Sequence, residues 1–164
     1  NYEHLIEVVD QVRTSLDVDL VIAGKPAWLA EPVLEAAAAR DHVRILGFVD
    51  DADLPALYRQ AAILAFPSLY EGFGLPPLEA MACGTPVVCS TAPSLEEVVG
   101  GAALCVEAED DVGLGEAIRR VSSDSALRED LRARGLARAA GFSWARAARE
   151  TLDVYDHVLS NTLG

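Results

Sequence analysis

The chain has 164 residues, of which 51% are hydrophobic and 24% charged, a composition typical of a single globular domain. Its formal net charge of −13 excludes the clustered cations that bind nucleic acid or an anionic membrane surface, so we expect neither partner. No apolar run reaches the about 18 residues of a membrane span and no signal-peptide pattern opens the chain, so we expect a cytoplasmic protein without a transmembrane segment.

Five short apolar runs bounded by turn residues predict β-strands at 18–24, 43–46, 63–66, 86–89 and 103–106. Segments of helical periodicity alternate with them, at 2–16, 29–40, 53–60, 77–83, 94–99, 111–121, 124–139 and 143–159. This alternation predicts an α/β fold with a parallel sheet and helices on both faces. The runs show no polar alternation, so we expect the strands to be buried on both faces.

The ends of several predicted helices carry further signals. Asp53 and Ser143 stand where N-cap residues are expected. The first helix has no strand before it, whereas a doubly wound sheet normally begins with a strand. We therefore expect the first strand to lie outside this sequence. The last helix is long enough to pack across to a partner, and Trp144 is predicted to be a packing residue.

The cysteines and histidines give no indication of a metal site. Cys83, Cys89 and Cys105 are odd in number, lie in apolar stretches and lack the spacing of metal ligands. We expect them to be reduced thiols of the core, which agrees with a cytoplasmic location. The three histidines are scattered along the chain, so no metal is expected.

The segment PSLYEGFGLPPLEAMACG, residues 67–84, combines a glycine loop with a helix start, a combination that favours phosphate binding. Yet it contains Glu71 and Glu79 and no lysine or arginine. Carboxylates are strong acceptors for the vicinal hydroxyls of sugars, so a ligand with phosphates between two sugars would fit. The alternatives are a capping-box role for Glu79 and a solvated loop charge for Glu71.

The same segment resembles the E-x7-E motif of the GT4 family of retaining glycosyltransferases, in the setting P-S-x-x-E-G-F-G-L-P-x-L-E-A-M-A-x-G-x-P-V-V. Further stretches that resemble the family are 20–25, 43–49, 53–58, 94–104 and 142–144. The resemblance covers nearly the whole chain and implies one half of a GT-B fold, in which two Rossmann-like domains face a cleft. Residues 1–164 would be the C-terminal donor-binding domain, without its first strand and without the N-terminal acceptor domain.

The resemblance also implies roles for individual residues. Glu71 would be the catalytic position and bind hydroxyls of the transferred sugar, and Glu79 would hold the ribose. The other donor-binding positions that it implies are Gly24, Gly47, Phe48, Val49, Gly72, Phe73, Gly74 and Leu75. Lys25, the only lysine of the chain, follows a strand at the edge where α/β sheets bind ligands. It is either a phosphate contact or a solvated loop lysine.

The family usually carries an arginine and a lysine, in and just after its first strand, that neutralise the diphosphate. Both would precede Asn1 and so lie outside this sequence. Stabilisation of the leaving group normally carries much of the catalysis, so the domain by itself is expected to be inactive. The nucleotide diphosphate sugar would be a substrate, and no cofactor is expected.

The implied function is transfer of a hexose from a GDP- or UDP-linked donor. Residues 24–28, GKPAW, resemble mannosyltransferase-like members, which slightly favours mannose. Three alternatives remain open at this point: a nucleotide-sugar epimerase, a disaccharide synthase for a sugar such as trehalose or sucrose, and a non-catalytic domain that binds nucleotide sugars.

Overall fold

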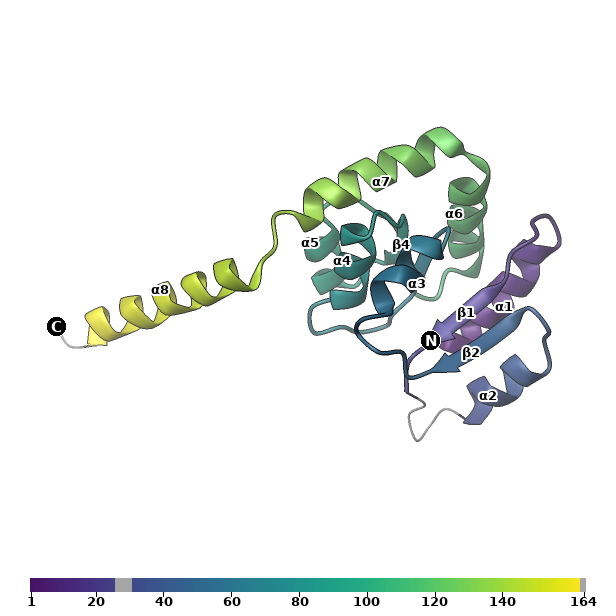
Figure 1. The fold of residues 1–164 in the computed structure, drawn as a ribbon, viewed down its shortest axis with the longest axis horizontal. Coiled ribbons are helices and arrows are strands. Elements are labelled where there is room, and N and C mark those ends of the chain that lie inside the picture. The colour runs from purple at the N-terminus through teal and green to yellow at the C-terminus, as the bar shows by residue number, and fades with distance from the viewer. Residues whose placement is uncertain (26–30, 163–164) are drawn as a thin grey trace.

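The computed structural model describes residues 1–25 and 31–162, which form eight helices and five strands (Figure 1). All strand pairings are parallel. The strands are β1 Leu20–Ala23, β2 Val43–Gly47, β3 Leu64–Phe66, β4 Val87–Ser90 and β5 Leu104–Val106. Each strand predicted from the sequence is present, with bounds within two residues of the prediction. The predicted α/β fold with a parallel sheet is therefore confirmed.

The sheet is divided into two parts, with β1 paired to β2 in one and the order β3-β4-β5 in the other (Figure 1). Both faces of β4 are covered. Val87 and Cys89 pack against the helices α4 and α5 on one face. Val88 packs against α1 and α6 on the other face. Helices thus cover both sides of the central strand, as the βα alternation predicts.

The helices are α1 Tyr2–Arg13, α2 Glu31–Ala38, α3 Leu54–Gln60, α4 Leu75–Ala82, α5 Pro93–Val99, α6 Asp111–Ser123, α7 Ser125–Ala139 and α8 Trp144–Thr162. The predicted start of α2 at residue 29 lies outside the described residues. Ser143 caps α8 as predicted, since its hydroxyl accepts from the N–H of Arg146. Asp53 stands at the N-cap position of α3, but its side chain makes no capping bond.

Two helix ends differ from the prediction for local reasons. Helix α4 begins two residues early, at Leu75, because Pro76 and Pro77 fit the first turn. The N–H groups of a first turn have no partner within the helix, so a proline there loses no hydrogen bond. Helix α1 ends three residues early. The hydroxyls of Thr14 and Ser15 donate back to carbonyls of the last turn, and this local bonding competes with continuation of the helix.

The prediction that every strand is buried on both faces is wrong for β1 and β2. Ile22 and Val43 face inward and pack in one cluster with residues of α1 and α2. Val21 and Leu46 point the other way, and their side chains are 44% and 48% exposed. Both helices cover the same face, so the opposite face of this strand pair is open.

The cysteines occupy the places expected of core thiols. All three are free; Cys89 is buried, and Cys83 and Cys105 are half-buried. Cys89 lies beside Cys105 on the neighbouring strand, with 3.8 Å between their sulfur atoms. The hydrogen bond to Cys105 and burial together raise the pKa of Cys89, which keeps this thiol protonated.

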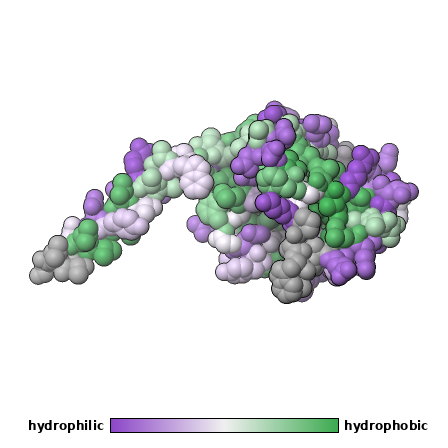
Figure 2. Space-filling model, turned by 60° about the horizontal axis from the view of Figure 1, so that its bottom comes forward, coloured by the Kyte–Doolittle hydropathy of each residue, from purple (hydrophilic) through white to green (hydrophobic). Residues whose placement is uncertain are grey.

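Helix α8 runs clear of the globular body (Figure 1) and is exposed over residues 144–161. Figure 2 shows hydrophobic residues along it as well as over the body. Trp144 is 83% exposed, so the prediction that it packs is wrong for this chain. Leu152 and Tyr155 share the helix with it and are also exposed. An amphipathic helix of this kind leaves an apolar stripe for another surface to cover.

Leu131 and Leu152 offer a matched test of which helices belong to the core. Leu131 of α7 is 1% exposed and packs in the cluster of α1 and α6, whereas Leu152 of α8 is 59% exposed. We expect Leu131→Ala to lower the free energy of unfolding by about 2–5 kcal/mol, because the substitution leaves a cavity. Leu152→Ala should change it by less than about 0.5 kcal/mol. Urea unfolding of both variants measures this, and equal losses would contradict the assignment.

Candidate functional site

Serine hydroxyls hold the loop that follows β3, and one of them binds the carboxylate of Glu71. The hydroxyl of Ser68 donates to Oε1 of Glu71 at 2.8 Å. The hydroxyl of Ser94, in α5, donates to the backbone carbonyl of Glu71 at 2.9 Å. Ser90, the last residue of β4, donates to the carbonyl of Ser68. Glu71 is half-buried and oriented, so it is more than a solvated loop charge.

Gly74 sets the geometry of the next turn. It is the N-cap of α4 with φ of 104°, a left-handed conformation that favours glycine. A Cβ at this position would stand 2.6 Å from Cδ2 of Leu95, so the backbone lies directly against α5. At Gly72 a Cβ would meet nothing within 4 Å. The loop therefore has no room for a side chain at Gly74 and has open space at Gly72.

Three backbone N–H groups at the start of α4 make no hydrogen bond with any described residue. Pro76 and Pro77 have no N–H, and the N–H of Leu78 donates to the carbonyl of Gly74. Within residues 1–25 and 31–162, the N–H groups of the three preceding residues have no hydrogen-bond partner; they are Phe73, Gly74 and Leu75. Free N–H groups at a helix start carry partial positive charge and bind anions.

Glu79 lies one turn further along α4 and is exposed. Its Oε2 accepts a hydrogen bond from the hydroxyl of Tyr58 in α3, at 3.0 Å. Helix α4 begins at Leu75, so Glu79 is its fifth residue and lies beyond the third position, from which a capping-box glutamate reaches back; the capping-box alternative for Glu79 is therefore wrong. Each of the two predicted carboxylates thus already accepts a protein hydroxyl. A carboxylate has about four acceptor positions, which leaves room for the hydroxyls of a ligand.

The other predicted residues gather where β1 and β2 end. The N–H of Gly24 donates to the carbonyl of Gly47 at 2.8 Å, which joins the two strand ends. The ammonium of Lys25 stands 4.7 Å from the ring centre of Phe48, a cation–π contact. Val49 follows, half-buried. The structure thus joins Lys25 to the segment predicted to receive the base.

The sequence assigned no role to three residues that hold the two glutamates: Ser68 and Tyr58 bind their carboxylates, and Ser94 binds the backbone carbonyl of Glu71. Ser68 precedes Glu71 by three residues, a spacing at which local side-chain bonds form, so this signal was readable. Tyr58 and Ser94 contact the motif from other helices, 21 and 23 residues away in the chain. No local pattern in the sequence predicts such contacts.

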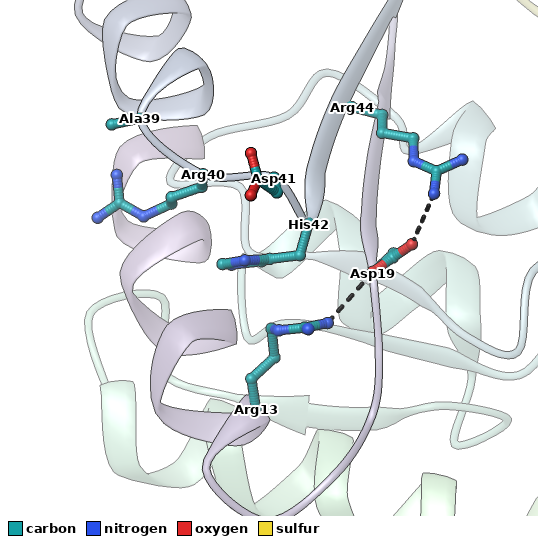
Figure 3. A pocket seen from close by; sticks show the side chains of 7 residues that line it. All are labelled: Arg13, Asp19, Ala39, Arg40, Asp41, His42 and Arg44. Carbon is teal, nitrogen blue, oxygen red and sulfur yellow. Dashed lines mark hydrogen bonds and ion pairs between the residues drawn. The ribbon is translucent and has the colours of Figure 1, made fainter.

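A separate hollow of about 440 Å³ lies at the opposite, amino ends of β1 and β2 (Figure 3). Its arginines are already paired. Arg13 and Arg44 both contact Asp19, at 3.2 and 3.0 Å. Arg40 and His42, which also line it, contact Asp10 at 2.7 and 2.8 Å. Cations committed to carboxylates leave little charge for an anionic ligand, so we assign this hollow a structural role.

Comparisons with known proteins agree with the fold and the loop. The family described as "Glycosyl transferases group 1" matches residues 1–138 of the chain. An O-antigen chain mannosyltransferase B from Escherichia coli is 41% identical over 147 residues, 88% of this chain and 39% of that protein. An MMP alpha-(1->4)-mannosyltransferase from Mycolicibacterium hassiacum is 35% identical over 164 residues, 96% of this chain and 40% of that protein.

Two solved structures are similar to the chain. A sucrose-phosphate synthase from Thermosynechococcus elongatus superposes with a TM-score of 0.83 at 28% identity, over 98% of this chain and 42% of that one. The C-terminal domain of a glycosyl transferase group 1 family protein from Francisella tularensis has a TM-score of 0.72 at 24% identity, over 85% of this chain and 77% of that one. The second likeness shows the fold alone.

The parallel α/β fold and the motif loop define a Rossmann-like domain of the GT-B type. The chain belongs to the family of group 1 glycosyl transferases, which confirms the GT4 resemblance of the sequence. It spans about two-fifths of the length of the two mannosyltransferases named above. Among the described residues, no helix is long and apolar enough to cross a membrane. In the same ranges, no group of three histidine, cysteine or acidic residues could hold a metal ion.

The two loop glycines make separable predictions for folding. We expect Gly74→Ala to lower the free energy of unfolding by about 1–3 kcal/mol, because it forces a left-handed conformation on alanine and places Cβ against Leu95. Gly72→Ala has open space and should stay within about 0.5 kcal/mol of the wild type. Urea unfolding measures both, and a Gly74→Ala variant as stable as Gly72→Ala would contradict the described turn.

Proposed function

We propose that this chain is the donor-binding domain of a retaining glycosyltransferase that transfers a hexose from a nucleotide diphosphate sugar to an acceptor. One observation carries the proposal: in chain order, Glu71 and Glu79 flank the N–H groups of residues 73–75, which have no hydrogen-bond partner in the part of the chain that the structure describes. Carboxylates suit hydroxyls and helix-start N–H groups suit phosphate, so this order fits a ligand with a central diphosphate. Membership of the family supports the reaction class.

The donor would lie along the loop in a fixed direction. Glu71 would bind hydroxyls of the transferred sugar, and the N–H groups of residues 73–75 would meet the diphosphate. Glu79 would hold the ribose, and residues 47–49 would receive the base through main-chain contacts. At Gly24 and Gly47 a Cβ would meet nothing within 4 Å, so a ligand could approach the backbone closely. Lys25 lies over Phe48 at the same strand ends and could turn to a phosphate.

In a retaining transfer the departing phosphate and the incoming acceptor meet on the same face of the sugar. The partial positive charge at the start of α4 would stabilise the departing diphosphate, and Glu71 would orient the sugar. We propose that this chemistry needs no metal. The arginine and lysine expected near the first strand would supply further charge. Without them the 164-residue chain should bind the donor and not transfer it.

Two features support a larger assembly within one protein. The sheet is divided between β1 and β3, and a further parallel strand between these two would complete it. The exposed apolar residues of α8 need a cover, and the matched mannosyltransferases are more than twice as long as this chain. We propose that residues outside this sequence supply the strand and an N-terminal acceptor domain that packs on α8.

The relatives give mannose a slight preference as the transferred sugar. The two described above are mannosyltransferases by name, at 41% and 35% identity. We therefore propose a hexosyl donor, GDP-mannose before UDP-linked sugars, and a cytoplasmic location where such donors are available. The likeness to a sucrose-phosphate synthase at 28% identity favours a disaccharide synthase as the second candidate.

Titration of the 164-residue chain with GDP, UDP, GDP-mannose and UDP-glucose, followed by NMR, tests the donor site. We expect amide shifts at residues 73–75, 78 and 79. Glu79→Gln should weaken nucleotide binding about 10- to 100-fold, because it removes charge-assisted hydrogen bonds worth roughly 1.5–3 kcal/mol. Glu71→Gln should weaken binding of the sugar nucleotide more than that of the free nucleotide.

Glu129→Gln is the matched control. Glu129 is exposed on α7 and pairs with Arg132 at 3.2 Å, away from the loop, so its loss should leave binding unchanged. Absence of any shift at residues 73–75, 78 and 79 with millimolar nucleotide would sink the proposed function. Added magnesium should not alter the affinity, and a strict need for it would refute the proposal of metal-free binding.

A further inference from the structure

Tyr58 reaches Glu79 from a different helix. The two residues are 21 positions apart, and the phenol hydroxyl of Tyr58 donates to Oε2 of Glu79 at 3.0 Å. Helix α3 lies against α4, so this bond spans the contact between them. The sequence pattern did not predict this contact between Tyr58 and Glu79, the carboxylate that we propose holds the ribose.

The tyrosine is itself held in place. Its half-buried ring packs against the core cluster that contains Ala80 and Met81 of α4. Its backbone carbonyl accepts a hydrogen bond from the hydroxyl of Thr85 at 2.6 Å, and Thr85 is buried. The hydroxyl of Tyr58 is therefore presented to Glu79 from a fixed base.

In this pair Tyr58 is the hydrogen-bond donor and Glu79 is the acceptor. Burial, the hydrogen bond to Glu79 and the negative charge of Glu79 together raise the pKa of Tyr58 well above its usual value. The phenol stays protonated throughout the neutral range and acts as a donor. One of the about four acceptor positions of the carboxylate is occupied by it, and the others stay open to a ligand.

An exposed glutamate without such a partner would sample many rotamers and lose that freedom when a ligand binds. A carboxylate already held in one orientation avoids most of that loss. Ser68 acts on Glu71 in the same way, so both carboxylates of the motif are held by a protein hydroxyl. Both Glu71 and Glu79 are therefore oriented before a ligand binds.

We propose that Tyr58 is a positioning residue that orients Glu79 toward a pair of ribose hydroxyls and so sets the preference of the site for ribonucleotides. The inference rests on the proposed function, in which Glu79 receives the ribose. Tyr58 does not touch the ligand in this role and acts only through the carboxylate. Removal of its hydroxyl should therefore affect the ribose and leave base and phosphate contacts intact.

Binding of GDP and of 2′,3′-dideoxy-GDP to the 164-residue chain, measured by calorimetry, tests the role. The wild type should bind GDP about 10-fold or more tightly than the dideoxy analogue. Tyr58→Phe should weaken GDP binding by roughly 3- to 10-fold and leave dideoxy-GDP binding unchanged, because phenylalanine keeps the ring and loses only the donor. Tyr155→Phe, at an exposed tyrosine of α8, is the matched control and should change neither.

A double-mutant cycle with Glu79→Gln gives an independent measure. If Tyr58 acts through the carboxylate, Tyr58→Phe should have no further effect on GDP binding once Glu79 is glutamine. Equal weakening of both nucleotides by Tyr58→Phe would mean a general structural role and would overturn the inference. A wild-type ribose preference that Tyr58→Phe leaves undiminished would overturn it as well and leave the donor site standing. No ribose preference in the wild type would overturn the proposed role of Glu79 too.

Discussion

The close contact between Gly74 and Leu95 is the constraint from which the site loop takes its shape. A left-handed residue at this point lets the chain turn directly over α5 and enter α4 without a side chain between them. The neighbour of Leu95, Ser94, holds the carbonyl of Glu71. Helix α5 is thus the platform on which the loop rests. Glu71 before the turn and Glu79 after it take their positions from this one backbone geometry.

The charge distribution around the loop explains how an acidic chain could hold an anionic ligand. The net charge is −13, and residues 67–84 contain no lysine or arginine. Oriented N–H groups take the place of cations, because a helix start carries partial positive charge without a titratable group. Pro76 and Pro77 cannot donate, so the donors offered to a ligand at this helix start are the N–H groups of residues 73–75. Several arginines elsewhere are engaged, as Arg138 is with the carbonyls of α5.

Much of the fold was predictable because its determinants are local. Apolar runs and helical periodicity located every strand and helix of the described residues, and the motif located both carboxylates. The failures have a common origin in long-range packing. Val21 and Leu46 belong to an apolar run that predicted burial, but the helices that could cover them both lie on the other face. Glu79 stood at a spacing suited to a capping box, but a tyrosine from another helix engages it instead.

The two halves of the proposed donor site stand on different parts of the sheet, and α1 connects them. Ile6 packs into the buried cluster of β1 and β2, the strands at whose carboxyl ends we propose that the base binds. Val8, on the same helix, packs with Val88 of β4 in the cluster of the other sheet part. At the start of α1, the side-chain amide of Asn1 donates to the carbonyl of Pro67, where the site loop begins, and to that of Ala108.

Helix α1 therefore fixes the distance between the strand ends at Gly24 and Gly47 and the loop that carries Glu71. A ligand that spans both would sense any shift of this helix, although no residue of α1 is proposed to touch it. Since close-packed interiors transmit strain, the buried residues of α1 affect donor binding through geometry alone. The site is a property of the packed domain, and the motif supplies only the groups that face the ligand.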